Sequence, residues 1–242
     1  MPKYDCYIEG FLGTGAIFLN KPLAKYNILN DHSRFIYELF LMLKEEPCEL
    51  YRRVEDALIY DKIINENQDK IEYQLLRSLY SIYTSCTATI VLGRRNAKKI
   101  FLEKLALYRE TVQKMLMHTV ITCRDIFKFL ASIESRNKIY STFIYLDPPY
   151  AVSKGRLFDN KGWSLSLLEK LIVEVKRYEW QFAISEFDDT AVIELFKKHG
   201  LYITTISKSS GASSKFGYDK HEILATSFNL RVSQDDRRVL FK

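Results

Sequence analysis

Several features are scarce in this sequence of 242 residues, and each scarcity excludes a class of protein. The chain has 9 Gly and 5 Pro, too few for a collagen-like or low-complexity protein. Its 4 Cys lie far apart without a Cys-x-x-Cys pair, which argues against a disulfide framework or a zinc site. No segment reaches the roughly 18 consecutive apolar residues of a membrane span, and the N-terminus has no apolar core of a secretion signal. We therefore expect a cytoplasmic protein without a metal site or a membrane partner.

The composition that is present indicates a folded, basic protein. Hydrophobic residues make up 47% of the chain and charged residues 27%, which is ordinary for a globular domain with a sizeable core. Lys and Arg number 36 against 30 Asp and Glu, for a net charge of +6. This excess favours a polyanionic partner, of which nucleic acid is the commonest, although charge alone does not identify one.

The order of apolar segments predicts an α/β fold. An apolar strand at 6–9, a glycine-rich turn and an apolar helix at 16–20 are typical of the first unit of a nucleotide-binding fold. A second strand at 26–29 ends in Asn30 and Asp31, and a helix should follow, with Phe35, Leu39 and Leu43 at helical spacing.

Residues 47–116 show helical periodicity and few strand patterns, so they predict an inserted helical subdomain. The α/β pattern then resumes, with a helix that Asp125 should open. Strands are expected at 119–122, 141–146, 181–184, 201–206 and 222–228, further helices at 165–178 and 191–199, and a loop at 207–220. The predicted fold is a Rossmann-like, mostly parallel sheet formed by residues 1–46 and 117–242, with ligands at the carboxyl ends of its strands.

Gly10, Gly13 and Gly15 form the turn after the first strand. Their Gly-x-x-Gly-x-Gly spacing differs from the dinucleotide fingerprint, which disfavours a dinucleotide oxidoreductase. No Gly-Lys-Ser/Thr follows, which disfavours a P-loop phosphotransferase. The turn could be structural, and Asp31, 16 residues after Gly15, could simply cap the next helix. Together, however, a glycine turn and an acid after the second strand favour an adenosine-containing ligand.

Asp147-Pro-Pro-Tyr150, directly after an apolar strand, is the sharpest motif. The two prolines remove two N–H donors and stiffen the backbone, so the Asp147 carboxylate and the Pro148 carbonyl can act as acceptors beside the Tyr150 ring. Such a pair suits an exocyclic amine on a heteroaromatic base, because hydrogen bonds to both acceptors favour a more tetrahedral nitrogen as it attacks. The alternative is a rigid loop with an exposed tyrosine.

These residues resemble the D12-class (Dam-like) DNA adenine-N6 methyltransferases. Tyr7-Ile-Glu-Gly-Phe-Leu-Gly-Thr-Gly-Ala-Ile-Phe-Leu-Asn20 is similar to the family's S-adenosylmethionine motif, and Tyr145-Leu-Asp-Pro-Pro-Tyr150 to its catalytic motif. Segments 123–127, 184–188 and 220–224 resemble its other strand ends. The family's N-terminal segment, which closes over the methionine half of the cofactor, is expected to be absent because the cofactor motif starts at Tyr7.

The resemblance implies S-adenosyl-L-methionine as cofactor, double-stranded DNA as partner and a target-recognition role for residues 47–116. It implies catalytic roles for Asp147, Pro148, Pro149 and Tyr150. It also implies a cofactor site, in which Asp147 would hold the methionine amino group as well as the target amine. The implied cofactor residues are Glu9, Phe11, Gly13, Gly15, Asp31, Asp125, Ile126 and Asp147. The setting would be a prokaryotic or phage-infected cell, with or without a restriction partner.

The DNA contacts are predicted from charge. Residues 47–116 hold 12 Lys or Arg and 9 Asp or Glu, a net charge of +3. Four of the cations lie within six positions after Gly93, and Lys215 lies in the later Ser/Gly-rich loop; the five predicted contacts are Arg94, Arg95, Lys98, Lys99 and Lys215. The cluster could instead be a solvated helix end. Two further alternatives are methylation of an amine in RNA or protein, and a non-catalytic DNA-binding relative.

Overall fold

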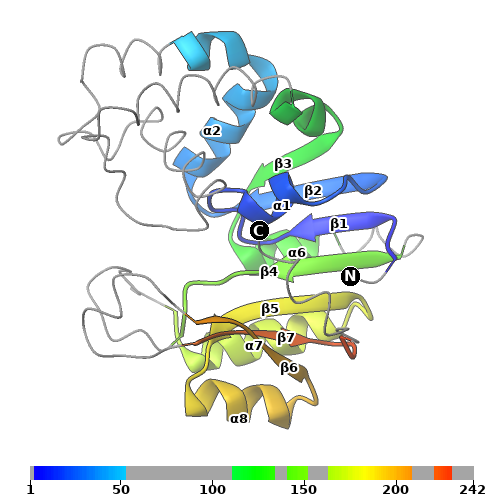
Figure 1. Ribbon diagram of the computed structural model, residues 1–242, viewed down its shortest axis with the longest axis vertical. Coiled ribbons are helices and arrows are strands. Elements are labelled where there is room, and N and C mark those ends of the chain that lie inside the picture. Colours follow the sequence, from blue (N-terminus) through cyan, green and yellow to red (C-terminus); the bar gives the residue numbers. More distant parts are fainter. Residues whose placement is uncertain (1–2, 53–110, 134–140, 152–162, 209–220, 231–242) are drawn as a thin grey trace, which may run out of the picture. The chain divides into compact units, whose positions relative to one another are not determined.

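A computed structural model describes residues 3–52, 111–133, 141–151, 163–208 and 221–230. Seven strands form one mixed sheet in the order β3-β2-β1-β4-β5-β7-β6, with helices between them along the chain (Figure 1). This is the predicted α/β, Rossmann-like architecture. The chain divides into two compact units, Leu12–Asp125 and Met1–Phe11 with Ile126–Lys242, which we call the β2–β3 unit and the β4–β5 unit.

The β2–β3 unit contains α1 (Ala16–Asn20), β2 (Tyr26–Asp31), α2 (Arg34–Glu45) and β3 (Thr119–Cys123). Strands β2 and β3 are parallel, with Asp31 opposite Cys123 at their carboxyl ends. Helix α2 buries Leu39, Phe40 and Leu43, whereas Phe35 is 49% exposed. The predicted helix is confirmed, but its apolar face begins one turn later than the spacing suggested.

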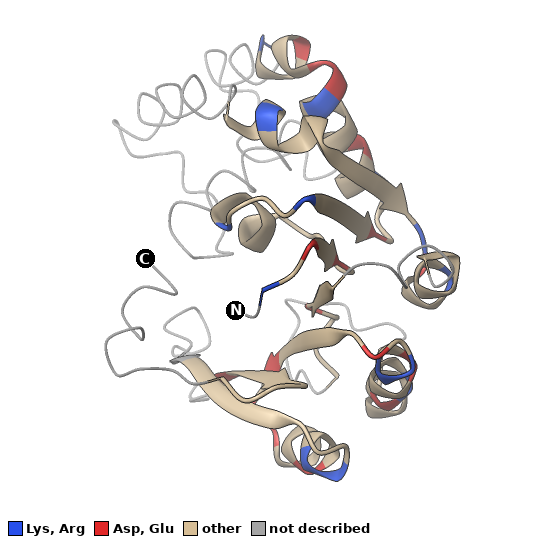
Figure 2. Cartoon of the chain, turned by 90° about the vertical axis from the view of Figure 1, so that its right-hand side faces the viewer, with Lys and Arg blue, Asp and Glu red and all other residues tan. Residues whose placement is uncertain are grey.

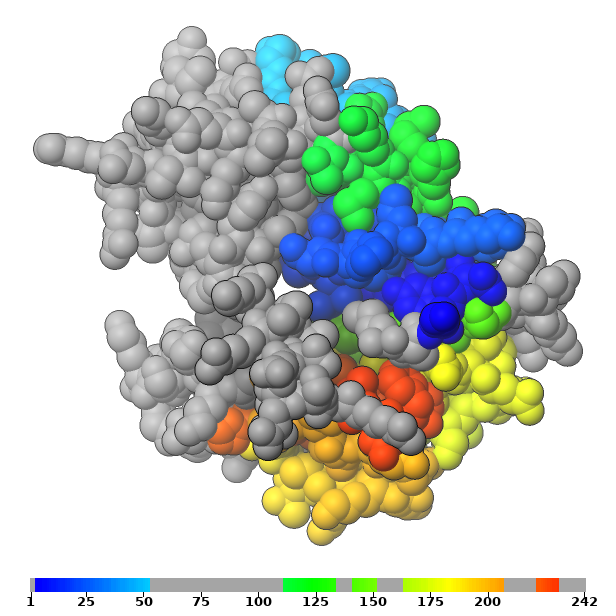
Figure 3. All heavy atoms as spheres, turned by 45° about the vertical axis from the view of Figure 1, so that its right-hand side comes forward, coloured from blue at the N-terminus to red at the C-terminus, as the bar shows by residue number. Residues whose placement is uncertain are grey.

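The β4–β5 unit contains β1 (Cys6–Glu9), β4 (Thr142–Leu146), β5 (Gln181–Phe187), β6 (Tyr202–Lys208) and β7 (His221–Thr226). Strands β1, β4 and β5 are parallel, whereas β7 runs antiparallel to both β5 and β6. Strand β7, the last of the described strands along the chain, therefore lies between β5 and β6. Figure 3 shows the red atoms of β7 beside the orange segment that precedes it in the sequence.

Three helices belong to the same unit: α6 (Ile126–Ile133), α7 (Leu165–Lys176) and α8 (Thr190–Lys198). Helix α7 lies beside both α6 and α8, and its buried side chains are Leu168, Leu171, Ile172 and Val175. Ser164 caps α7 by accepting from the Leu167 N–H at 3.3 Å, and Asp189 caps α8 by accepting from the Ala191 N–H at 3.0 Å. No helix within the described ranges is long and apolar enough to cross a membrane.

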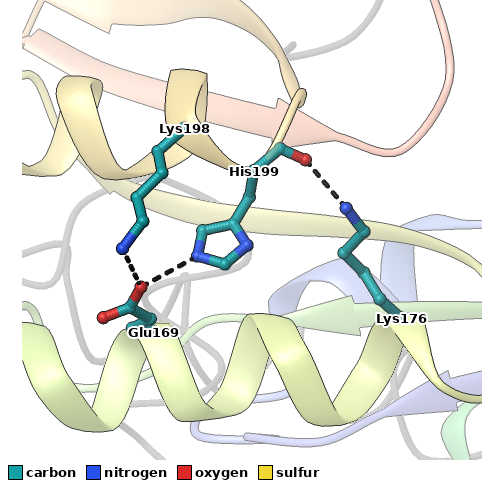
Figure 4. A network of polar contacts seen from close by, with 4 residues as sticks. All are labelled: Glu169, Lys176, Lys198 and His199. Atoms are coloured by element: carbon teal, nitrogen blue, oxygen red, sulfur yellow. Dashed lines mark hydrogen bonds and ion pairs between the residues drawn. The ribbon is translucent and has the colours of Figure 1, made fainter.

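Polar contacts on the surface join α7 to the end of α8 (Figure 4). Glu169 Oε1 accepts a hydrogen bond from Lys198 Nζ at 2.7 Å and lies 3.1 Å from His199 Nε2, and Lys176 Nζ donates to the His199 carbonyl at 2.9 Å. The hydrogen bond from Lys198 is the largest of the effects that lower the pKa of Glu169. Elsewhere in the described chain, charged residues lie mainly on helices and near strand ends (Figure 2). Most positions within the strands are therefore uncharged and can be buried in the core.

The predicted strands and helices outside the insert are confirmed with changed ends. Of the predicted loop at 207–220, Ser207 and Lys208 instead belong to β6, and the rest lies outside the described residues. Strand β5 continues through Ser185 and Glu186 to Phe187, whereas the sequence predicted that it ends at residue 184. Helix α7 ends at Lys176 instead of Tyr178. At the margins of the predicted insert, residues 47–52 and 111–117 are helical. The rest of the insert lies outside the described residues, so the division into two domains stays a prediction.

Candidate active site

In the β4–β5 unit, the candidate site lies at the carboxyl ends of β1 and β4. The two strands are neighbours, with Glu9 opposite Tyr145. After β1 and after β4 the chain continues in opposite directions along the strand order. Open α/β sheets bind ligands at such a reversal, beyond the carboxyl ends of the strands. The Gly10 N–H donates to the Tyr145 carbonyl at 3.0 Å. A Cβ on Gly10 would lie 2.6 Å from Leu146 Cδ2, so glycine permits this close approach.

Asp147, the first residue after β4, is held by a residue of the next strand. The Ser185 hydroxyl donates to Asp147 Oδ1 at 2.7 Å, and the Tyr145 hydroxyl donates to Ser185 Oγ at 3.1 Å. Solvent reaches Asp147, yet protein atoms surround its carboxyl group, and this desolvation raises its pKa to about 6. The Ser185 hydrogen bond lowers that pKa and the charge of Glu222 raises it.

The rest of the motif is also fixed by β5. The ring of Tyr150 packs against Phe187, with centroids 4.2 Å apart and an interplanar angle of 60°. Burial, followed by the charge of Asp147, raises the pKa of Tyr150, so the phenol stays neutral. Glu186 is fully buried, and its Oε1 accepts from the Ala151 N–H at 2.7 Å. Consecutive residues Ser185, Glu186 and Phe187 thus hold both ends of the loop.

Strand β1 ends in a buried carboxyl group, Glu9, and Phe11 beyond it contacts the ring of Trp163. Glu9 is 2% exposed, and its Oε2 accepts from the Tyr7 hydroxyl at 2.6 Å. Burial and the neighbouring Glu9 raise the pKa of Tyr7 well above its usual value. Phe11 meets Trp163 edge-on with centroids 5.6 Å apart, and the buried Trp163 indole N–H has no acceptor in the part of the chain that the structure describes. Ile126 is also buried.

The glycine turn and Asp31 come together within the β2–β3 unit. Asp31 Oδ2 accepts from the Gly13 N–H at 2.8 Å, and Oδ1 accepts from the Ser33 N–H at 2.7 Å. Burial raises the pKa of Asp31, and these two hydrogen bonds oppose that rise. Ser33, not Asp31, is the N-cap of α2. The Asp31 side chain therefore fixes the turn and positions the residue that begins the helix.

Two glycines of the turn have left-handed backbones. Gly13 has φ of 51° and Gly15 has φ of 72°, a region that other residues rarely adopt. A Cβ on Gly15 would lie 2.4 Å from Phe40, whereas a Cβ on Gly13 would meet no atom of the described residues within 4 Å. Gly15 is thus required for packing, and Gly13 leaves an open space beside the turn.

Asn30 and the loop after β3 complete this edge of the β2–β3 unit. The Asn30 side chain donates to the Arg124 carbonyl at 3.0 Å and accepts from the Arg124 N–H at 3.1 Å. This pair of bonds fixes the backbone directly before Asp125, which is half-buried. Sequence analysis assigned no role to Asn30, although a buried asparagine at a strand end is a sign of such a bridge.

The structure thus brings together two groups of predicted residues, one in each unit: Gly13 with Asp31, and Asp147 with Tyr150. It adds Ser185, Glu186 and Phe187 to the second group. The predicted DNA contacts Arg94, Arg95, Lys98, Lys99 and Lys215 lie outside the described residues and stay predictions. No cluster of metal-ligating side chains occurs among the residues described.

Comparisons with known proteins agree on one family. Residues 1–202 match the family model for the D12 class N6 adenine-specific DNA methyltransferase. The chain is 24% identical over 168 residues to a DNA adenine methylase of Salmonella typhi, covering 62% of this chain and 58% of that one. It is 29% identical over 170 residues to a DNA adenine methylase of Haemophilus influenzae, covering 62% and 56%. The match therefore spans less than two thirds of the length of these relatives.

Proposed function

The chain belongs to the D12 class of N6 adenine-specific DNA methyltransferases, and from this we propose that it transfers a methyl group from S-adenosylmethionine to N6 of adenine in duplex DNA. The observation that carries the proposal is the geometry of Asp147. Its Oδ1 is held by Ser185, while its Oδ2 accepts no hydrogen bond from the described residues. One oxygen of the motif's carboxylate is therefore available to a substrate donor.

The proposed chemistry follows from that acceptor. The adenine amine is a poor nucleophile because its lone pair is delocalised into the ring. Asp147 Oδ2 and the Pro148 carbonyl would accept its two N–H groups, and these hydrogen bonds strengthen as the nitrogen becomes tetrahedral and acquires positive charge. Asp147 must be ionised for this role, so its raised pKa sets a lower limit on the working pH.

Tyr150 supports the base in this proposal. An adenine within a duplex is inaccessible to the strand-end loop, so the base must leave the helix to reach it. A tyrosine ring offers a flat apolar face on which the extruded base can stack. The contact with Phe187 restricts the motion of this ring, which lowers the entropic cost of stacking.

The residues present fit the proposed cofactor. Membership in a methyltransferase family implies a methyl donor, and when bound, S-adenosylmethionine supplies an electrophilic methyl group on its sulfonium centre. Asp31 retains acceptor capacity beyond its two backbone bonds, as ribose hydroxyls require, and the space beside Gly13 leaves room for a ligand. In the β4–β5 unit, Glu9 and Phe11 supply a buried acceptor and an aromatic edge.

Transfer of tritium from labelled S-adenosylmethionine to duplex DNA, RNA and protein tests the proposal. We expect label in duplex DNA alone, recovered as N6-methyladenine. Asp147→Ala should lower this transfer by about 100-fold or more, because it removes the side-chain acceptor of the motif. Label in RNA or protein would instead support the other amine substrates, and cofactor binding without transfer to any acceptor would support a non-catalytic relative.

A further inference from the structure

We propose that Ser185 is a positioning residue for methyl transfer, which with Tyr145 holds Asp147 Oδ1 and so leaves Oδ2 as the oxygen that receives the target amine. This inference rests on the proposed function of Asp147. It assigns a role to a strand β5 residue outside the Asp-Pro-Pro-Tyr motif.

Hydrogen-bond direction is the first argument. A serine hydroxyl has one proton to donate, and two acceptors lie near it: Asp147 Oδ1 at 2.7 Å and the Leu146 carbonyl at 3.4 Å. The shorter contact, to an ionised group, is the stronger. Tyr145 donates to Ser185 Oγ at 3.1 Å, which occupies an acceptor position of the serine and directs its proton toward Asp147. The three side chains therefore form one directed chain.

The rigidity of Ser185 is the second argument. Ser185 is 4% exposed and lies in β5, which pairs with β4 on one side and with β7 on the other. Leu146, the residue before Asp147, is paired with Ile184, the residue before Ser185. Strand register thus places the hydroxyl beside the carboxylate without a flexible loop, as a preorganised acceptor requires.

The charges around Asp147 are the third argument. Glu222 of β7, Tyr145 of β4 and Tyr150 of the loop interact electrostatically with this carboxyl, and Glu222 makes ionisation harder. Glu186 of β5 is a further acidic group beside Tyr150. Against burial and this negative charge, the Ser185 hydroxyl is what lowers the pKa of Asp147. Ser185 would therefore both orient the carboxylate and keep it ionised at neutral pH.

The test compares Ser185→Ala with Ser185→Thr, which keeps a hydroxyl, and with Thr226→Val as a matched control. Thr226 is a fully buried residue of β7 whose hydroxyl donates to the Phe228 carbonyl at 2.7 Å, away from Asp147. Two quantities are measured for each protein: the pH profile of methyl transfer, and the NMR titration of the Asp147 carboxyl carbon, assigned with Asp147→Asn.

In Ser185→Ala we expect kcat to fall about 10- to 100-fold, because the acceptor loses its alignment, with little change in the KM for the cofactor. The acid limb of the profile and the carboxyl titration should both move to higher pH by roughly 0.5–1. Ser185→Thr should restore both in part. Thr226→Val should lower thermal stability and leave both unchanged.

Two results would overturn the proposal: a carboxyl titration in Ser185→Ala that coincides with that of the wild type, or an equal displacement in Thr226→Val. Failure of the proposed function would give a different experimental result. In that case the wild type transfers no methyl group to any acceptor, and the carboxyl titrations alone then decide whether Ser185 controls Asp147.

Discussion

Replacement of Gly13 by alanine separates ligand binding from folding, because Gly200 provides a matched control. Both glycines are exposed, with left-handed φ of 51° and 69°, and a Cβ at either position meets nothing within 4 Å in the part of the chain that the structure describes. Gly13→Ala and Gly200→Ala therefore carry the same backbone strain without a steric clash. This strain should cost each variant about 1–2 kcal/mol of folding free energy.

Ligand binding should distinguish the two variants. The new methyl group of Gly13→Ala would occupy the space beside the turn whose N–H donates to Asp31. Gly200 follows α8, remote in sequence from every predicted cofactor residue. We expect S-adenosylmethionine affinity to fall at least about tenfold, or 1.4 kcal/mol, in Gly13→Ala and to stay unchanged in Gly200→Ala.

Isothermal titration calorimetry at one temperature measures the affinities, and denaturant titration measures the folding cost. Because both variants should lose the same folding free energy, a difference in their affinities for the cofactor reports on the ligand site alone. Equal affinities in Gly13→Ala, Gly200→Ala and the wild type, with equal stability losses, would refute the reasoning. The open space beside Gly13 would then be solvent at a structural turn.

The other predictions concern three carboxyl groups, those of Asp31, Asp147 and Glu186. Asp31→Ala should weaken S-adenosylmethionine binding by about 1.5–3 kcal/mol, the range for a hydrogen bond to a charged group; unaltered binding by calorimetry would place the ribose elsewhere. Methyl transfer should decline as pH falls through about 6, where Asp147 takes up a proton, and a profile flat down to pH 5 would contradict this. Because its folded-state pKa exceeds the ordinary 3.8, the contribution of Asp147 to stability decreases as pH rises from 3.8 to about 6. Glu186→Ala should lower the free energy of unfolding, measured by denaturant titration, by about 1–3 kcal/mol, because it leaves the Ala151 N–H without its acceptor. Glu186→Gln keeps one side-chain oxygen and should therefore lose less.

The sequence was informative wherever a property is local. Strand β1 and helix α1 occur at the predicted residues, because an apolar run, a glycine turn and an apolar helix are each encoded by neighbouring positions. The glycine turn and Asp31 were likewise identified from positions close in the sequence, and the Gly13 N–H donates to Asp31 Oδ2 in the structure. The functional interpretation of Asp147 also came from local chemistry, namely a carboxylate and a carbonyl fixed by two prolines.

What the sequence could not supply depends on distant contacts. Ser185 meets Asp147 across 38 positions, and no local pattern predicts which strand lies beside the motif. The end of β5 was placed too early because Ser185 and Glu186 are polar, yet strand pairing with β7 extends it to Phe187. Phe35 matched the helical spacing but remains exposed, since spacing identifies a helix face without showing how far the neighbouring elements cover it.

The place of β7 beside β5 has a consequence for the order of assembly during synthesis. Ser185, Glu186 and Phe187 pair with Leu224, Ile223 and Glu222, so one edge of β5 stays without its partner until residues 221–226 have been made. After a nascent chain has completed the Asp-Pro-Pro-Tyr motif, about 75 more residues, some seconds of translation, must be added before β7 can pair with β5. Until then that edge presents unpaired backbone groups to other chains, and a ribosome that stalls in this interval leaves an aggregation-prone product. The loop that carries Asp147 is thus synthesised well before the strand that completes the pairing of β5, on which the loop is held.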